Sequence, residues 1–193
     1  AVFNGYTDKD ASEKKILRNV FKDGDAWFNT GDLIKTVDVG FAFGKEHYQF
    51  VDRVGDTFRW RSENVSTNEV GEILNGFMDV NMSNVYGVEV PGCEGRAGMA
   101  AFSLEDVKNF NWNAFSEHVE NNLPKYARPV FIRIIQEMDT TGTFKLKKNE
   151  LRDESFDLNK VSDIVYCLKP SSNTYELLDQ DWLNKINSCE AGY

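Results

Sequence analysis

Four basic side chains in the C-terminal half form the first group whose chemistry can be read from the residues. Lys145, Lys147, Lys148 and Arg152 stand close together in a chain that is acidic as a whole. Ammonium and guanidinium groups are hydrogen-bond donors that bind phosphate oxygens well. A basic run of this kind is more often a solvated face. The residues alone leave both interpretations open.

The sulfur and imidazole groups argue against metal chemistry. Three cysteines (Cys93, Cys167, Cys189) and two histidines (His47, His118) are widely spaced, and no Cys-x-x-Cys occurs. Structural zinc sites combine such ligands at short, characteristic spacings. We therefore expect no metal site in this chain, and reduced, cytosol-facing thiols.

Composition narrows the class of protein. The 193 residues include 31 acidic and 22 basic side chains, a net charge of −9, and 41% are hydrophobic, enough for a sizeable core. An acidic surface repels phosphate backbones, so we expect no nucleic-acid partner. No apolar stretch approaches the ~20 residues that span a bilayer. The chain begins at Ala1 without a Met or a signal-like segment, which indicates a fragment.

Apolar periodicity and capping residues predict the elements that position these groups. Helices are predicted over 10–21, where Asp10 and Glu13 have capping-box spacing, and over 66–77, 112–123 and 181–186. Strands are predicted over 26–33, 37–44, 47–53, 57–61, 85–90, 97–104 and 129–135. Because strands and helices alternate after residue 56, we predict a compact α+β fold, a small mixed sheet of about three strands with packed helices.

A boundary between two parts of the chain is predicted near Arg53–Asp56. The pattern differs on the two sides, and Gly55 frees the backbone there. Gly55 is either a hinge or the glycine of an ordinary turn, and composition does not choose between them.

Three blocks in order resemble the adenylate-forming superfamily, whose members activate carboxylates as acyl-AMP and then form a thioester. They are FNTGDL (28–33), DRVGDTFRWRSENVSTNEV (52–70) and TTGTFKLKKNEL (140–151), and LPKYARPVF (123–131) is similar to the family's connecting strand region. The second block is typical of the branch of very-long-chain fatty acyl-CoA synthetases and fatty acid transport proteins. Ser62, where Gly is more usual, resembles the fungal form.

The resemblance also implies a division of the chain. Residues 53–193 would form the mobile C-terminal lid domain with a tail, and residues 1–52 would be a remnant of the large N-terminal domain, namely its closing strands. Those strands should be poorly supported without their partners, because unpaired edges and exposed apolar faces are unfavourable.

Two residues would bind the nucleotide. Asp32 matches the aspartate that holds the ribose hydroxyls of ATP, and Arg53 matches an arginine that reaches the nucleotide near the interdomain junction. A carboxylate accepts two hydroxyl hydrogen bonds, and a planar guanidinium suits ribose and phosphate oxygens. The residues alone also allow Asp32 to bond its own turn, and Arg53 to form a surface salt bridge with Asp52 or Asp56.

Lys145 matches the catalytic lysine that members of the superfamily swing into the adenylation site. Negative charge gathers where the carboxylate meets the α-phosphate, and one ammonium in a water-poor site stabilises it. Many members have Gly directly before this lysine, whereas Phe144 stands here, a change that the fatty acid transport branch tolerates. Taken alone, Lys145 is an ordinary solvated charge.

Three further residues match the face that lines the pantetheine tunnel of CoA during the thioester step: Trp60, Arg61 and Ser62. Phe58 and Trp60 also alternate with polar neighbours as in a half-buried strand, so both fit a small core equally well. The two roles are compatible, because opposite faces of one strand can serve core and ligand.

The implied function is that of an ATP-dependent long- or very-long-chain fatty acid–CoA ligase that uses ATP, Mg²⁺ and CoA. The chain contains no phosphate-binding loop. We therefore expect Mg²⁺ and the fatty acid to bind to the protein's own N-terminal domain, and the fragment alone to be inactive. The expected location is intracellular and membrane-associated, at the endoplasmic reticulum, peroxisome or lipid droplet, through peripheral contact of the full-length protein.

Two alternatives stay open. The region would be a lipid-handling or uptake module without catalysis, or part of a ligase for another carboxylic acid, such as a siderophore acyl group. The presence of Asp32, Arg53 and Lys145 together counts against the first alternative, because docking alone would not require them.

Overall fold

The computed structural model describes residues 5, 7–41, 43–54, 56–136 and 148–193. The chain divides into two compact units, residues 1–55 and residues 56–193, which we call the N-terminal unit and the C-terminal unit. Each is described by itself. The assignment of residues 1–52 to a larger domain stays a prediction.

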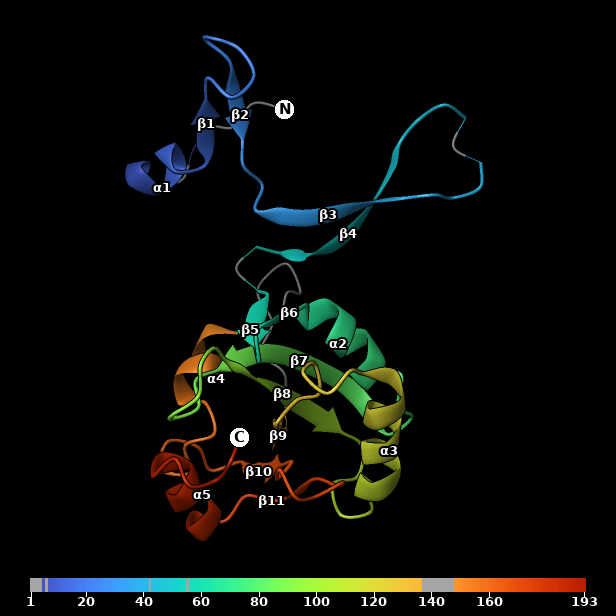
Figure 1. Ribbon diagram of the computed structural model, residues 1–193, viewed down its shortest axis with the longest axis vertical. Coiled ribbons are helices and arrows are strands. Elements are labelled where there is room, and N and C mark those ends of the chain that lie inside the picture. The colour runs from blue at the N-terminus through green and yellow to red at the C-terminus, as the bar shows by residue number, and fades with distance from the viewer. Residues whose placement is uncertain (1–4, 6, 42, 55, 137–147) are drawn as a thin grey trace. The chain divides into compact units, whose positions relative to one another are not determined.

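The N-terminal unit consists of one short helix and two hairpins (Figure 1). Strands β1 and β2 pair antiparallel, as do β3 and β4, with a bulge between Leu33 and Ile34. The bounds are α1 Lys9–Glu13, β1 Ile16–Arg18, β2 Ala26–Phe28, β3 Asp32–Val37 and β4 His47–Arg53.

Two predictions for this unit are wrong. The helix predicted over 10–21 ends at Glu13, and Asp8 rather than Asp10 caps it. The chain then forms a hairpin because the Asp25 carboxylate accepts the backbone N–H groups of Val20, Phe21 and Lys22 and fixes the turn. The strand predicted over 37–44 instead runs over Asp32–Val37, so Asp32 begins a strand.

The N-terminal unit has no core of its own. None of its described apolar side chains is buried, and Phe21 and Phe43 are 78% and 89% exposed. Solvated apolar surface of this extent is unfavourable. The hairpins are therefore held by their ladders and turns rather than by packing.

The C-terminal unit is an α+β fold, as predicted, built on a five-stranded sheet of order β11-β10-β9-β8-β7. Neighbouring strands of this sheet run antiparallel, except that β8 and β9 run parallel and are joined through α3 (Figure 1). The sequence pattern missed two strands of this sheet, β10 and β11, and also β6 outside it. The bounds are β5 Phe58–Trp60, β6 Glu63–Val65, α2 Thr67–Asn75, β7 Val80–Val88, β8 Ala97–Leu104, α3 Trp112–Asn122, β9 Phe131–Ile134, α4 Asn149–Glu154, β10 Ile164–Cys167, β11 Glu176–Leu177 and α5 Gln180–Asn187.

The predicted helices of this unit are confirmed at 66–77, 112–123 and 181–186. The Ser66 hydroxyl accepts the N–H of Glu69 at the start of α2, as the capping box requires. Phe115 of α3 is fully buried, in edge contact with Phe102 of the sheet and Phe77 after α2. Aromatic packing of this kind fixes both helices against one sheet.

The end of the chain also belongs to this core. Leu183 and Ile186 of α5 are buried. The Tyr193 ring packs against Phe131 of the central strand β9, and its hydroxyl accepts a hydrogen bond from the Trp182 indole N–H.

Helix α4 is tied to the sheet by a buried charge. The Arg133 side chain on β9 is only 8% exposed and lies 2.6 Å from both Glu154 of α4 and Asp163. Burial disfavours its charge, but the two carboxylates outweigh this effect and raise the pKa of Arg133.

The β5–β6 hairpin lies closely against the sheet because glycine leaves room for it. Gly87 and Gly98 face each other on β7 and β8, and a Cβ on Gly87 would lie 2.6 Å from Cβ of Phe58. Gly95 allows an even closer approach: it has φ +87°, and a Cβ there would lie 2.3 Å from the Arg59 carbonyl oxygen. The N–H of Arg96 donates to that same oxygen at 2.7 Å.

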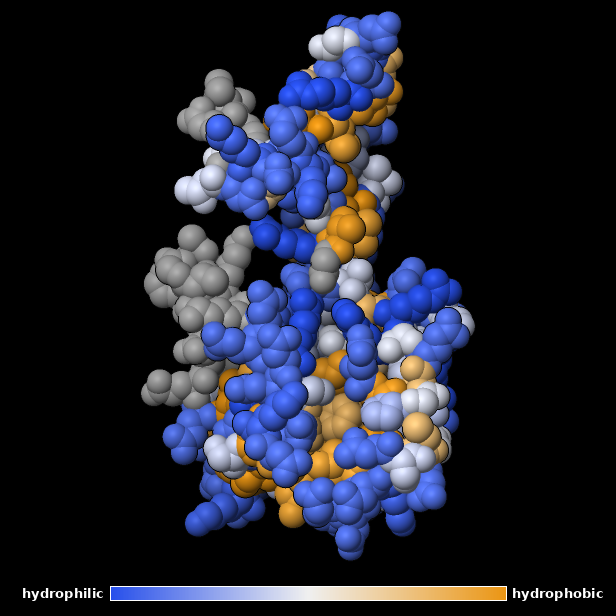
Figure 2. All heavy atoms as spheres, turned by 90° about the vertical axis from the view of Figure 1, so that its left-hand side faces the viewer, coloured by the Kyte–Doolittle hydropathy of each residue, from blue (hydrophilic) through white to orange (hydrophobic). Residues whose placement is uncertain are grey.

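Figure 2 shows one face of the surface. On the C-terminal unit, apolar atoms lie in a hollow framed by hydrophilic side chains (Figure 2). This arrangement is typical of a concave site in a well-formed core.

We predict that Gly95→Ala destabilises the C-terminal unit by about 2–4 kcal/mol, because the new Cβ meets backbone that cannot move alone. Gly192→Ala is the matched control: its φ is +77°, but no atom lies within 4 Å of the added Cβ. We expect the control to cost about 1 kcal/mol. Urea unfolding followed by tryptophan fluorescence measures both, and equal losses would contradict the close approach.

Candidate functional site

Asp32 and Arg53, far apart in sequence, lie opposite each other at the open end of the β3–β4 hairpin. They are direct cross-strand partners. Arg53 Nε lies 3.6 Å from Asp32 Oδ1, and the two side chains are 53% and 32% exposed. A ligand can therefore reach both groups.

The turn before Asp32 is stabilised by other side chains. The side-chain Oδ1 of Asn29 accepts the N–H of Gly31, and the Thr30 hydroxyl accepts the N–H of Asp32. Gly31 has φ +77°, which favours glycine. The Asp32 carboxylate therefore faces Arg53, and the side chains of Asn29 and Thr30 make the hydrogen bonds of the turn instead.

The alternative partners of Arg53 have other contacts. The Asp52 carboxylate accepts the backbone N–H of Arg53 at 2.8 Å, whereas the Asp56 carboxylate lies near Lys148 and Arg152. The guanidinium of Arg53 pairs with Asp32. The structure thus supports the geometry of the predicted pair, while nucleotide binding stays a prediction.

Two predicted residues, Lys145 and Gly55, lie outside the described residues. The basic residues just beyond Lys145 serve the fold: Lys148 Nζ donates to Thr67 Oγ1 at 2.9 Å, and Arg152 lies 3.3 Å from Asp56. Both side chains are less than a third exposed. The sequence allowed them to be either a phosphate site or a solvated face, and neither interpretation fits their contacts.

Arg61 and Ser62 form the two-residue turn of the β5–β6 hairpin. Both have positive φ, +52° and +67°, as a type I′ turn requires, and Trp60 pairs with Glu63 across it. This backbone explains why glycine suits position 62: only glycine adopts positive φ without cost. The Arg61 guanidinium lies over the buried Trp60 ring, 6.0 Å from its centre.

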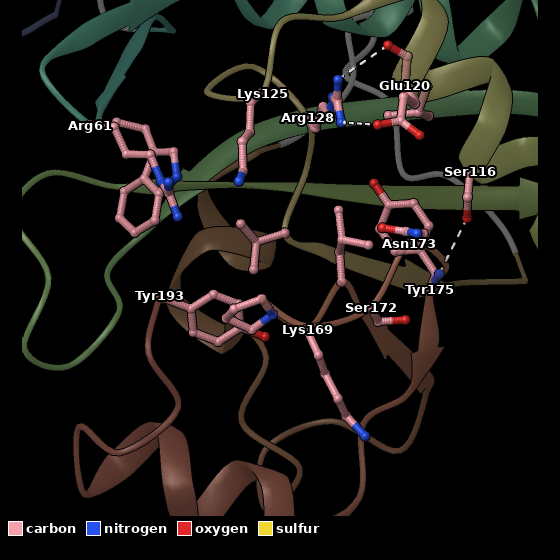
Figure 3. Close-up of a pocket in the computed structure, with 15 residues that line it drawn as sticks. Arg61, Ser116, Glu120, Lys125, Arg128, Lys169, Ser172, Asn173, Tyr175 and Tyr193 are labelled. Carbon is pink, nitrogen blue, oxygen red and sulfur yellow. Dashed lines mark hydrogen bonds and ion pairs between the residues drawn. The ribbon is translucent and has the colours of Figure 1, made fainter.

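A cavity of about 290 Å³ lies beside this turn, with Trp60 and Arg61 in its wall (Figure 3). Phe58 and Trp60 are both buried, so the core interpretation is confirmed for them while Trp60 still borders the cavity. Ser62 lines a second cavity of about 440 Å³, with Cys93 and Tyr193. The CoA role of Trp60, Arg61 and Ser62 stays a prediction.

Several cations line the first cavity, and two of them are neutralised. Arg128 donates to the Glu120 carboxylate, the Glu120 carbonyl and the Leu123 carbonyl. Lys169 donates to Glu176 at 2.8 Å, and this bond lowers the pKa of Glu176.

Within the part of the chain that the structure describes, Arg61 and Lys125 form no ion pair. Both extend into the same cavity (Figure 3). Two uncompensated cations around a half-polar cavity form a natural site for an anionic group. Sequence reasoning missed Lys125. Its only sequence signal was its place in LPKYARPVF, since its proximity to Arg61 arises from tertiary packing.

No group of three or more potential metal ligands occurs among the described residues. Nor does the described part of the chain contain a helix long and apolar enough to cross a membrane.

Comparison with known proteins places the fold. The C-terminal part of an amide bond synthetase from Marinactinospora thermotolerans superposes with a TM-score of 0.60 over 78% of this chain and 28% of that protein, at 22% identity. No family model matches the sequence. The fold is that of the C-terminal domain of adenylate-forming enzymes.

Sequence relatives are much closer. The chain is 43% identical over 189 residues to long-chain fatty acid transport protein 6 of mouse, covering 97% of this chain and 30% of the relative. It is 44% identical over 173 residues to a medium/long-chain-fatty-acid–CoA ligase of Mycobacterium tuberculosis, covering 90% of this chain and 28% of the relative. The chain therefore corresponds to the C-terminal part of a fatty acid transport protein or acyl-CoA synthetase of the adenylate-forming superfamily. It spans less than a third of the length of these relatives.

The turn geometry gives a prediction for Ser62. Ser62→Gly removes the cost of positive φ and should stabilise the C-terminal unit by a few tenths to about 1 kcal/mol. The matched control is Ser188→Gly, where φ is −86° and the same change should give a small loss through chain entropy. The measurement is the urea midpoint, and stabilisation of both variants to the same extent would refute the assignment of strain to Ser62.

Proposed function

We propose that this chain is part of an ATP-dependent fatty acid–CoA ligase, which adenylates a fatty acid and transfers the acyl group to CoA. The observation that carries the proposal is the Asp32–Arg53 pair, because both predicted nucleotide ligands meet at one accessible hairpin end. The names of the relatives, fatty acid transport proteins and fatty acid–CoA ligases, support the same substrates.

In this proposal the pair binds the nucleotide. The Asp32 carboxylate accepts hydrogen bonds from the ribose hydroxyls, and the guanidinium of Arg53 donates to the nucleotide's oxygens. The exposure of both side chains and their separation of 3.6 Å leave donors and lone pairs available. The pair thus holds each group in place before the ligand binds, which reduces the entropy lost on binding.

Lys145 supplies the cation of the adenylation step. Its ammonium group would stand where the fatty acid carboxylate attacks the α-phosphate and would stabilise the charge that gathers there. We further propose that Gly55 is the hinge that lets the C-terminal unit present Lys145 for adenylation and the β5–β6 turn for thioester formation.

CoA would bind beside the β5–β6 turn. Trp60, Arg61 and Ser62 border the pantetheine path, and Arg61 with Lys125 would hold an anionic group of CoA in the 290 Å³ cavity. The buried Trp60 fixes the turn to the sheet, so Arg61 is held by the core and not by a loose loop.

The rest of the machinery would lie in a larger N-terminal domain. The exposed apolar faces of the N-terminal unit need a partner of this kind, which supports residues 1–52 as its closing strands. Mg²⁺ and the fatty acid would bind there. Membrane association at the endoplasmic reticulum, peroxisome or lipid droplet, and a fungal source suggested by Ser62 alone, remain part of the proposal. The two relatives named above are from mouse and Mycobacterium tuberculosis.

Lys145→Ala in the full-length protein should lower the rate of acyl-AMP formation by about 10²–10³-fold, because the charge at the α-phosphate loses its cation. Lys147→Ala, two residues away, should leave the rate nearly unchanged. Pyrophosphate release driven by fatty acid and ATP measures the step. Unchanged acyl-AMP formation in the Lys145 variant would favour the lipid-handling module instead.

Arg61→Ala and Lys125→Ala in the full-length protein should each raise the KM for CoA by roughly 10- to 100-fold, since a charge-assisted hydrogen bond contributes about 1.5–3 kcal/mol. Acyl-AMP formation, which does not involve CoA, should be unaffected. Lys108→Ala, an exposed cation away from the cavity, serves as the control. Equal effects on both half-reactions would argue for a structural role of these two cations.

A further inference from the structure

The structure brings two of the three cysteines together beside the predicted CoA residues. Cys93 lies in the turn between β7 and β8, and Cys189 follows α5. Both are free thiols; Cys93 is partly buried and Cys189 is exposed.

The side chain of Cys189 lies over the glycine that precedes Cys93. A Cβ on Gly92 would lie 2.7 Å from Sγ of Cys189 and 2.9 Å from its Cβ. Cys93 directly follows Gly92, and adjacent Cα atoms are about 3.8 Å apart. The Cα of Cys93 is therefore one residue away from the contact between Gly92 and Cys189. The absence of a side chain at Gly92, which has φ +76°, is what admits Cys189.

The last residues of the chain complete the arrangement. The Cys93 thiol donates to the Tyr193 carbonyl oxygen at 3.6 Å. Gly92, Cys93 and Tyr193 line the 440 Å³ cavity together with Arg61 and Ser62. Gly192 and Tyr193, the last two residues of the segment Cys189–Tyr193, therefore form part of the wall of that cavity, and no disulfide holds the segment there.

We propose that Cys93 and Cys189 form a reversible disulfide that fastens the C-terminal segment to the β7–β8 turn. Cytosolic disulfides are usually transient and redox-sensing, so this pair would respond to an oxidising glutathione pool. The inference does not depend on the proposed ligase activity.

The chemistry needs a disulfide of the glutathione type as oxidant. The exposed Cys189 thiolate attacks one sulfur of glutathione disulfide and releases one glutathione thiolate. The Cys93 thiolate then attacks the Cys189 sulfur and releases the second. The two protein thiols lose two protons and two electrons, and one glutathione disulfide becomes two glutathione molecules. This order follows from access, and burial also raises the pKa of Cys93.

The third cysteine provides a control. Cys167 on β10 is fully buried, and burial raises its pKa to about 11, so it should react with neither partner. Cys167→Ala should therefore form the disulfide as the natural chain does. Cys93→Ser should stop as a glutathione adduct at Cys189, and Cys189→Ser should stay reduced.

The test is mass spectrometry of the whole 193-residue chain after equilibration with glutathione disulfide. We expect a product that has lost two hydrogen atoms, with Cys93 and Cys189 joined in the peptide map. The oxidised chain should also unfold at a temperature roughly 5–10 °C higher, because the bond closes a long loop. A stable glutathione adduct on the natural chain, a bond to Cys167, a bond between two chains, a fully reduced product or an unchanged unfolding temperature would each overturn the proposal.

Discussion

The close approach of the β5–β6 hairpin to the main sheet is the constraint on which the site depends. Gly87 and Gly98 make room for Phe58, and Gly95 lets the backbone of Arg59 come within hydrogen-bonding distance of Arg96. This contact buries Trp60 and so places the next two residues at a fixed edge of the core. Both cavities of the C-terminal unit that contain predicted CoA residues exist because the hairpin lies there.

The two units show how differently a fold can be supported. The C-terminal unit has a continuous core of buried aromatic and branched side chains, and the buried cation Arg133 has two carboxylate partners. The N-terminal unit instead shows half-exposed aromatic side chains along both hairpins. Its order rests on side-chain bonds within turns, such as those of Asp25 and Asn29. The Asp32–Arg53 pair is therefore placed by strand register and not by packing.

The sequence predicted helices correctly where the capping residue and the apolar periodicity indicate the same element. The capping box at Ser66 and the apolar stripes of α2 and α3 gave the helices, because periodic burial and a cap agree there. The same spacing at Asp10 and Glu13 gave a helix that is too long. Asp25 stabilises a turn there through hydrogen bonds to the backbone, and apolar periodicity carries no information about such bonds. Lys125 was missed for a related reason: its partner across the cavity lies far away in the sequence, and only the tertiary fold joins them.

The buried end of the chain has a consequence for biosynthesis. Leu183 and Ile186 are core residues, and the Tyr193 ring covers Phe131 on the central strand. A ribosome adds these side chains after all five strands of the sheet, so the sheet has an open apolar face until they are made. A nonsense codon a few residues before position 183 would therefore leave a chain with every proposed substrate-binding group but an unsealed core. Such a truncation would lower the amount of protein through cellular quality control, rather than remove a substrate-binding residue.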